Sequence, residues 1–464
     1  MEFLKLKDIS FALALALLGN LVHAQTPQIV SNDLKIADIG IRLDRFSMGL
    51  MDAVEKQKGV QSFESLKSEV SSVFASTPSI LRTIETQGLL DAKKAEAFSR
   101  FLPQVRGSFS SGDQKVRYSD RSSLNDQGRI SSNGVTISQL LFDFGATSKT
   151  YQSSDESRKA GLAKIQQDRS SALLALIRSR IELRRTSQRL ELVNAFLESR
   201  KQFLDLVRQK ASLGVNSNAD IIRAESKVFE AADELPFALK RFNEAKLRYK
   251  ELYGKENKGV DAYQGPAFNS AEFEDADSML ETLGTVIEAR GMLKAAENDY
   301  EAAKARLLGT TQLESSTNKS RTDLYGPRSD SSLQVVYRVE FYSGGAQMAV
   351  IDQSAAKRNE LKWEVERIER EQRRVLEESF ANYLAQKTSV TSRISVLRGA
   401  KAASDITKEL FNYSRSSLTD VFKVQEDYLA AAKNLVETES DYHVSYYEML
   451  HAYNLLIKKF EISI

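Results

Sequence analysis

The chain contains no cysteine among its 464 residues, and it contains only 6 prolines, 22 glycines and 1 tryptophan. The absence of cysteine excludes thiol catalysis, cysteine-based zinc sites and lipidation of an N-terminal cysteine. A chain without thiols can also occupy an oxidising compartment without mispaired disulfides. The small numbers of prolines and glycines suit long, uninterrupted helices.

Neither sign of charge is in excess, because 65 lysines and arginines balance 63 aspartates and glutamates. A chain with so little net charge has no overall field to attract nucleic acid, which is therefore not expected as a partner. The length fits two or three ordinary domains, or one elongated domain.

Long apolar runs are also scarce. Residues 1–24 contain a short apolar core at 11–18 and a small-residue site that ends at Ala24, which predicts a secretory signal cleaved near Ala24. A membrane anchor is the alternative, but this run is too short to span a bilayer comfortably. No later segment approaches 18 apolar residues, so a mature protein that enters a membrane must do so as a β-barrel.

Motifs for catalysis and metal binding are missing from the sequence. There is no Gly-x-Ser-x-Gly elbow and no phosphate-binding glycine loop. His443 and His451 stand eight residues apart with no carboxylate cluster, and Trp363 is interpreted as a packing residue. We therefore expect no enzymatic activity, no metal site and no cofactor.

Two stretches of the chain look like copies of each other, 200 residues apart. Residues 141–146 (LFDFGA) align with 341–346 (FYSGGA), and residues 214–221 align with 414–421. In each copy about 68 residues of helix-like sequence separate the two landmarks. A duplicated unit of strand, very long helix, turn and returning helix is therefore predicted.

The sequence between the landmarks is typical of coiled coils. A mostly apolar ladder with a seven-residue spacing runs through the first copy at Leu162, Arg169, Leu176, Leu183, Leu190, Leu197, Leu204 and Ala211. Shifted by 200 residues, the second copy gives Leu376, Tyr383, Val390, Leu397, Ser404 and Phe411. A strict seven-residue repeat predicts helices that coil around their neighbours, and a helix of this length would reach roughly 100 Å.

Each long helix is preceded by sequence typical of strands. In the clearest one, Leu333, Val335 and Tyr337 alternate with mainly polar residues, which is the two-residue period of a sheet with one apolar face. Four strands cannot close a barrel, and open edges cannot face lipid, because each unpaired backbone group is costly there. Other subunits must therefore complete the sheet, and three subunits would give about twelve strands.

The predicted boundaries are, in chain order, a signal peptide at 1–24, an N-terminal extension at 25–64, a first repeat at 65–253, an equatorial linker at 254–283 and a second repeat at 284–464. The first repeat is expected to contain a helix at 65–100 with a break near Pro78, strands 104–118 and 134–142, a long helix 144–212, and a return helix 218–253 interrupted by a kink at Pro236. The second is expected to contain a helix at 284–306, strands 307–318 and 332–342, a long helix 344–412 and a return helix 418–459. Polar loops are expected at 119–133 and 319–330, and the extension has no predicted role.

Taken together, these features resemble the TolC family of outer-membrane channel proteins. The resemblance covers roughly residues 65–460 and rests on the Leu102-Pro103 strand entry, the segment 141–145, its copy ending in Gly344-Gly345, and the two tip motifs ending in Asp220 and Asp420. No single motif is specific, but their order, duplication and spacing are.

The resemblance implies a membrane α+β fold in which each chain gives four strands to a trimeric, 12-stranded transmembrane β-barrel. A long coiled-coil, α-helical tunnel would extend from it into the periplasm. The implied function is a channel in the outer membrane, the exit duct of a tripartite type I secretion or multidrug efflux system driven by an inner-membrane pump. The implied partners are two further copies of the chain, a periplasmic adaptor (membrane fusion) protein, an inner-membrane transporter and outer-membrane lipid.

The resemblance also implies a pore constriction at the periplasmic tip. Asp420 falls on the position of an acidic ring, Asp220 is its match in the first copy, and Lys423 stands where some relatives carry a second acid. The residues implied to dock the adaptor and pump are Leu213, Gly214, Val215, Ser217, Ser414, Arg415 and Ser417. The strand-to-helix junctions fall at Gly145, Gly344 and Gly345. Alternatively, both aspartates only cap their helices, because each follows a serine by three residues.

A periplasmic coiled-coil adaptor that links the two membranes is the second hypothesis. It would share the helical hairpins, but it leaves the alternating strands and the duplicated strand-to-tip unit unexplained. Within the channel hypothesis, the absence of a lipidated cysteine favours the general or type I secretion branch by analogy.

Overall fold

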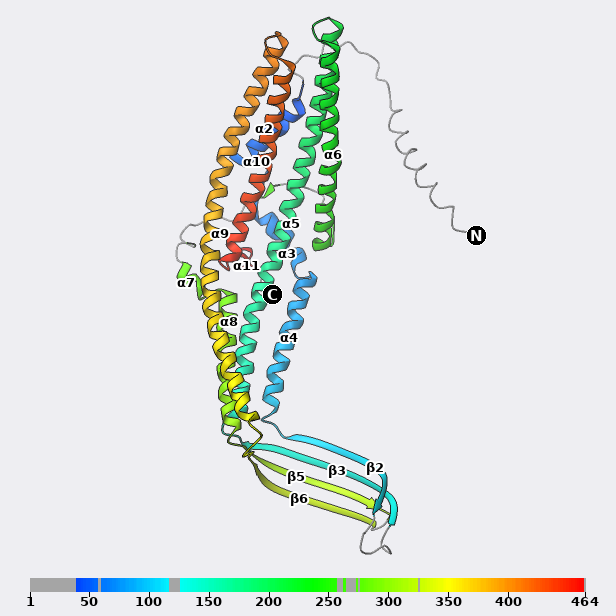
Figure 1. Ribbon diagram of the computed structural model, residues 1–464, viewed down its shortest axis with the longest axis vertical. Helices are drawn as coiled ribbons and strands as arrows, with labels where there is room; N and C mark the ends of the chain where they lie inside the picture. The colour runs from blue at the N-terminus through cyan, green and yellow to red at the C-terminus, as the bar shows by residue number, and fades with distance from the viewer. Residues whose placement is uncertain are drawn as a thin grey trace, which may run out of the picture.

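The computed structural model describes residues 39–56, 60–116, 126–256, 262–263, 273, 276–323 and 326–462. The predicted signal peptide and the first part of the predicted extension lie outside these residues. The molecule is elongated, with a sheet at one end and two helical hairpins that turn at the other end (Figure 1). The helices between these ends run along the long axis.

Two copies of one unit make up most of the fold. The first contains α4 (Pro78–Ser99), β2 (Gln104–Val116), β3 (Asp126–Phe142), α5 (Ala146–Ser212) and α6 (Asn218–Tyr253). The second contains α8 (Gly284–Arg306), β5 (Thr310–Thr322), β6 (Gly326–Arg338), α9 (Ala346–Asn412) and α10 (Leu418–Ala452). Both α5 and α9 have 67 residues, and Ala346 follows Ala146 by 200 positions. The internal duplication predicted from the sequence is confirmed.

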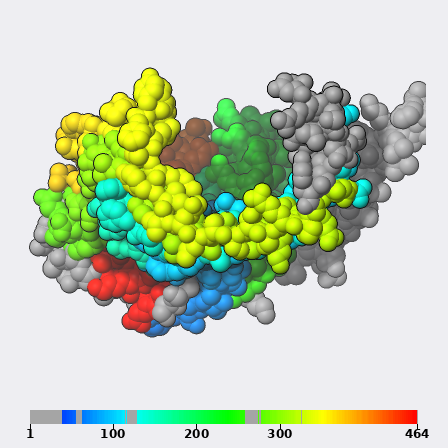
Figure 2. All heavy atoms as spheres, turned by 90° about the horizontal axis from the view of Figure 1, so that it is seen from below, coloured from blue at the N-terminus to red at the C-terminus, as the bar shows by residue number. Residues whose placement is uncertain are grey.

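The four long strands form one antiparallel sheet in the order β2-β3-β5-β6, which leaves β2 and β6 at its edges. The sheet curves across the end of the molecule seen in Figure 2. Its register aligns Val105 with Ile137, Ile137 with Ser315, and Ser315 with Leu333. Up to the irregularity between Leu140 and Phe142, odd-numbered residues of all four strands therefore share one face.

The two faces of the sheet differ in polarity. The odd-numbered face carries the exposed apolar side chains Val105, Phe109, Val135, Ile137, Leu333, Val335 and Tyr337. On the even-numbered face, Ser132 donates to Asn318 Oδ1 at 2.8 Å, and Arg338 donates to both oxygens of Glu314 at 2.6 and 2.9 Å. The alternation read from β6 thus extends across the whole sheet.

The strands reach further from the helices than predicted. β3 begins at Asp126, inside the loop expected at 119–133, and β5 and β6 occupy most of the loop expected at 319–330. The polar run at 131–133 pairs with β2 on one side and with β5 on the other. The backbone hydrogen bonds between strands do not depend on side-chain polarity. Serines and asparagines, which favour loops when no neighbouring strand pairs with them, are therefore held in strands here. At the end nearest the helices, β6 ends at Arg338, whereas the predicted strand ended at 342. Arg338 pairs with Thr310, the first residue of its partner β5.

Several helix ends also differ from the prediction. The break expected near Pro78 separates α3 (Phe63–Phe74) from α4, and α3 begins two residues earlier than predicted. Pro78 is the first residue of α4, a position that suits proline. The return helix expected at 418–459 ends at Ala452, because Asn454 adopts a left-handed conformation with φ 55°. The short helix α11 (Leu456–Phe460) follows it.

Pro236 does not end the return helix. α6 runs from Asn218 to Tyr253 through this proline. Its buried face includes Ala224, Ala231, Ala238 and Ala245, which are seven residues apart and lie along α5. Alanines at this spacing let two helices approach closely, and this continuous packing holds the helix across the backbone bond that proline removes.

The N-terminal extension and the linker contain structure of their own. The extension contains α2 (Ile41–Lys56) and β1 (Val60–Gln61), and β1 pairs in parallel with β4 (Ala262–Tyr263) of the linker. The linker also contains α7 (Ala276–Leu280). α2 contacts helices of both copies: Arg42 pairs with Glu198 of α5 at 3.2 Å, and Glu55 pairs with Arg398 of α9 at 2.7 Å. The extension is therefore part of the helical body.

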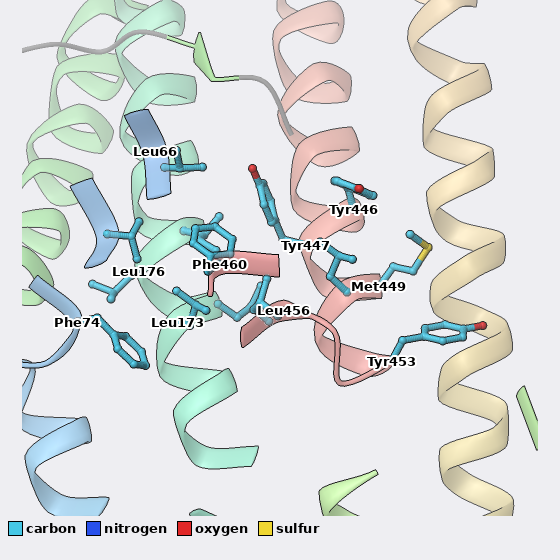
Figure 3. Packing of buried hydrophobic residues seen from close by; sticks show 14 of the residues in the cluster. Leu66, Phe74, Leu173, Leu176, Tyr446, Tyr447, Met449, Tyr453, Leu456 and Phe460 are labelled. Carbon is cyan, nitrogen blue, oxygen red and sulfur yellow. The ribbon is translucent and has the colours of Figure 1, made fainter. Parts of the chain in front are cut away.

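The main hydrophobic core lies midway along the helices. Figure 3 shows Leu66 of α3, Leu176 of α5, Tyr447 of α10 and Phe460 of α11 gathered in this core. Phe460 also makes an edge-on ring contact with Phe63, with ring centroids 5.1 Å apart. Two further clusters continue along α5 towards the tips, so α5 has buried residues over most of that distance.

The contact between α5 and α8 gives the first testable prediction. A Cβ added at Gly291 of α8 would lie 2.9 Å from the Cβ of Ala160. Gly291→Ala should therefore lower the free energy of unfolding by about 1 kcal/mol, since overpacking costs about 1–3 kcal/mol and helix propensity returns up to about 1 kcal/mol. Thermal unfolding followed by circular dichroism measures the change.

The matched control is Gly399→Ala in α9, where no atom of the described residues lies within 4 Å of the added Cβ. It should raise the unfolding temperature, because only the gain in helix propensity remains. Equal shifts in the two variants would contradict close packing at Gly291.

Candidate functional site at the helical tips

Both long helices end in the same kind of turn. After α5, the N–H of Gly214 bonds the carbonyl of Ala211 at 3.0 Å and the N–H of Val215 bonds that of Lys210 at 2.9 Å. After α9, Ser414 and Arg415 make the equivalent pair of bonds at 3.1 and 2.8 Å. This pair of backbone hydrogen bonds defines a Schellman motif, which needs one left-handed residue.

The left-handed residue differs between the two copies. It is Gly214 in the first, with φ 75°, and Ser414 in the second, with φ 56°. Glycine adopts this conformation without strain, whereas a residue with a Cβ pays about 1 kcal/mol. The second tip is thus more strained than the first.

Each return helix begins with a capping box. In the second copy the N–H of Asp420 donates to Ser417 Oγ at 3.2 Å, and Asp420 Oδ2 accepts from the N–H of Ser417 at 3.2 Å. Ser217 and Asp220 make the same reciprocal bonds in the first copy, at 3.3 and 3.0 Å. The helix-capping interpretation of both aspartates is correct, and it leaves room for a second role.

The two aspartates differ in how their charge is presented. Hydrogen bonds from Ser417 hold the pKa of Asp420 below its ordinary value, and the nearby Lys423 contributes a smaller lowering. The pKa of Asp220 is lowered mainly by the backbone N–H of Ser217. Both aspartates cap through Oδ2, but Arg223 lies 3.7 Å from Asp220 Oδ1, whereas Asp420 is exposed and has no cation within ion-pair distance among the described residues. Of the two carboxylates, Asp420 on α10 is therefore the one that presents its negative charge to solvent.

The residues expected to dock partners lie on the two exposed turns. Leu213 is 78% exposed and Val215 is 57% exposed, which is unusual for large apolar side chains. Gly214, Ser217, Ser414, Arg415 and Ser417 are exposed as well. The structure thus brings the predicted residues together as two neighbouring loops at one end of the molecule (Figure 1).

Sequence reasoning missed the residues that tie the two tips together. Lys210 of α5 donates to the carbonyls of Phe411 and Asn412 at 3.1 and 3.3 Å, so it caps the end of α9 rather than its own helix. Its ammonium also lies 4.6 Å from the Phe411 ring centroid, and burial lowers its pKa. A lysine in a last helical turn is an ordinary capping signal, and nothing in the sequence shows which helix it serves.

Arg200 makes a second tie, from α5 to α10. Its guanidinium donates to Gln425 Oε1 at 2.9 Å and lies between the rings of Phe196 and Phe422 at 4.7 and 4.8 Å. Burial lowers its pKa to about 10, so it stays charged at neutral pH. Such a charged group, buried and stacked, fixes the distance between the helices that hold it.

The opposite ends of the long helices begin at the predicted junction glycines. Gly145 and Gly345 precede α5 and α9 with φ 89° and 86°, and each follows another left-handed residue, Phe144 or Gly344. Asp143 accepts from the N–H groups of Gly145 and Thr147, at 3.1 and 2.6 Å. These two left-handed residues turn the chain sharply from strand into helix.

The two histidines of α10 have structural partners. His451 packs on α5, where Ser170 Oγ lies 2.7 Å from its Nδ1, and His443 lies 3.9 Å from Glu439. Burial, aided by the charge of Arg178, lowers the pKa of His451 to about 4. Within the described residues, no group of three histidine, aspartate or glutamate side chains is placed to hold a metal ion. Nor does any helix among them combine the length and apolarity needed to cross a membrane.

Comparison with known proteins supports the resemblance found in the sequence. Residues 75–255, which cover the first copy of the unit, match the model of the outer membrane efflux protein family. This match agrees with the resemblance to the TolC family of outer-membrane efflux and secretion channel proteins. A curated relative, nodulation protein T of Rhizobium leguminosarum bv. trifolii, is 24% identical over 378 residues, or 78% of each chain.

Solved structures show the TolC-like fold over nearly the whole chain. The outer-membrane channel OprN superposes with a TM-score of 0.73 at 15% identity, covering 93% of this chain and 98% of its own. The CmeC outer membrane channel of Campylobacter jejuni gives 0.72 at 16% identity, covering 85% and 86%. The open state of the MtrE channel of Neisseria gonorrhoeae gives 0.69 at 14%, covering 84% and 89%. The fold class predicted from the duplication is confirmed.

The unequal tips give a prediction about stability. Ser414→Gly should stabilise the second tip by up to about 1 kcal/mol, because glycine relieves the left-handed strain. The reciprocal change, Gly214→Ser, should destabilise the first tip by a similar amount. Hydrogen exchange of the tip amides measures both effects. Shifts of the same sign in the two variants would contradict the strain at Ser414.

His451 predicts how stability depends on pH. Its pKa falls from an ordinary value of about 6.5 in the unfolded chain to about 4 when folded, so the unfolded state binds the proton first. Stability is therefore full above about pH 6.5 and is lost as the pH falls towards 4, by at most about 3 kcal/mol. Chemical unfolding between pH 7.5 and 4.5 measures this loss. His451→Gln should flatten the curve, and an unchanged pH dependence in that variant would rule His451 out as the cause.

Proposed function

We propose that this protein is a homotrimeric channel of the outer membrane that extends into the periplasm as a helical tunnel. It would act as the passive exit duct of a type I secretion or multidrug efflux system. The observation that carries the proposal is the duplicated strand-to-tip unit, in which a sheet with one apolar face continues into two hairpins with matching tips.

The open edges of the sheet support the trimer. β2 and β6 each pair with one neighbour only, so each leaves a row of backbone groups without a partner in the sheet. In lipid these groups must be satisfied, and joining β6 of one copy to β2 of the next does this by symmetry. Three copies would supply about twelve strands, with the odd-numbered apolar face towards lipid and the even-numbered polar face towards the lumen.

The tips supply the constriction. Three-fold symmetry would place three copies of Asp420 around one axis, where like charges attract cations and repel anions. Lys423, three residues further along α10, would soften that ring, and Asp220 would contribute less because Arg223 offsets its charge. The buried ties of Lys210 and Arg200 would hold the hairpins together in the resting state.

The exposed turns support the assignment of partners. Leu213 and Val215 present apolar surface at the far end from the sheet, which suits docking of a periplasmic adaptor and an inner-membrane transporter. The energy for transport would come from that transporter. The predicted signal peptide fits export to the outer membrane.

Planar-bilayer conductance tests the channel and its constriction together. The purified wild-type trimer should show a small, stable conductance, and Asp420→Asn should raise it and weaken block by multivalent cations. Asparagine can still accept the capping bond, so this variant removes charge with little effect on the helix start.

The control is Ser417→Ala, which retains the carboxylate but removes the hydroxyl of the cap, at a cost of about 1 kcal/mol in helix stability. Its conductance and cation block should match the wild type. If Asp420→Asn also matches the wild type, Asp420 only caps its helix. A soluble monomer with no conductance would overturn the channel itself.

A further inference from the structure

The odd-numbered face of the sheet changes character along the strands. Nearest the helices it is apolar: Val105 pairs with Ile137, and Leu333 and Val335 follow each other on the same face of β6. Further out the same face carries Lys319 and Arg321 of β5, Arg129 of β3 and Lys115 of β2, all of them exposed. We call these four cations the basic band.

The register places the basic band at the end of the strands that is far from the helices. Lys319 pairs with Asn133, two positions further out than the pair Thr317–Val135, and Arg321 pairs with Ser131 beyond it. Arg129 lies opposite Asp113, and one face position further out Lys115 lies opposite Gln127. The two zones meet in the row of Phe109, Asn133 and Lys319, and the cations continue from there away from the helices.

Charge at this position is poorly balanced within the chain. Neither Lys319 nor Arg321 has a carboxylate within ion-pair distance among the residues that the structure describes. On the even-numbered face the contrast is clear, since Arg338 pairs with Glu314 at 2.6 Å and Arg328 with Asp330 at 2.9 Å. Arg338 and Arg328 of the even-numbered face are thus neutralised by neighbouring carboxylates, whereas Lys319 and Arg321 of the odd-numbered face are not.

Strand length fixes the depth of the band, on the basis of the function proposed above. The 13 residues of β6 extend roughly 43 Å, or about 33 Å of height at a tilt near 40°. An apolar belt in such a barrel is about 25 Å tall, so the outer rows pass beyond the hydrocarbon into the headgroup layer. Phosphate groups are the anions found there, and lysine and arginine bind them by charge-assisted hydrogen bonds.

We propose that the basic band is a binding surface for phosphorylated lipid of the outer leaflet, with Lys319 and Arg321 at its centre. The bound headgroups anchor the sheet at a fixed height in the membrane. The inference rests on the proposed insertion of the sheet, with its odd-numbered face towards lipid.

The test is native mass spectrometry of the full-length trimer in detergent micelles that contain diphosphoryl lipid A. The wild type should retain this lipid in preference to phosphatidylethanolamine. The double variant Lys319→Gln/Arg321→Gln should weaken retention by roughly thirtyfold, as expected for two lost cation–phosphate contacts. The matched control, Arg106→Gln/Arg328→Gln, removes the same charge from the even-numbered face and should retain the lipid as the wild type does.

Equal retention by the wild type and the outer-face variant would overturn the inference, and so would equal losses in the two double variants, which would reflect net charge alone. If the outer-face variant does not assemble, the wild type is compared on diphosphoryl and fully dephosphorylated lipid A, where equal retention also overturns it. Bilayer conductance of the same preparations separates the two proposals. Conductance without lipid selectivity leaves the channel standing, whereas a wild type that neither forms trimers nor conducts removes the proposed function.

Discussion

The packing of α5 along its whole length is the interaction on which the rest of the structure depends. A helix of 67 residues is stable in water only if its apolar side is covered. α5 buries 26 of its residues against helices of both copies, whereas α9, of equal length, buries 9. α5 is thus the helix against which the other helices of the chain pack. The exposed apolar side chains of α9, such as Val396 and Ile406, leave a face that a neighbouring copy would cover in the proposed trimer.

The two hairpins are joined by apolar clusters that contain residues of both, and charged side chains add further links. Arg200 reaches α10, Lys210 reaches the end of α9, and Lys227 of α6 lies 3.1 Å from Glu426 of α10. Breaking such partly buried pairs leaves charges without partners, which costs more than separating apolar surfaces of the same size. The tips of one chain should therefore move as a unit, and any opening would occur first between chains.

The sequence predicted the fold well because its main signals are periodic. The seven-residue ladder placed α5 and α9, and the alternation in β6 predicted a sheet with two unlike faces. The outer halves of the strands escaped notice because serine and asparagine favour loops unless neighbouring strands hold them, as happens at Ser132 and Asn133. Likewise, Pro236 was interpreted as an interruption because the sequence shows the alanines spaced by seven residues but not that they are buried along α5. Lys210 and Arg200 could not be identified, since their partners lie about 200 residues away.

The capping boxes bear directly on what the tip aspartates do. Because serine followed three residues later by an acid is an ordinary helix start, the presence of Asp220 and Asp420 says little about a pore. What separates them is their surroundings. Arg223 lies 3.7 Å from Asp220, which is half-buried, while Asp420 is exposed and has no cation within ion-pair distance among the described residues. A capping role does not require that exposure. The asymmetry between two otherwise matching helix starts therefore favours Asp420 over Asp220 as the group that faces the channel axis.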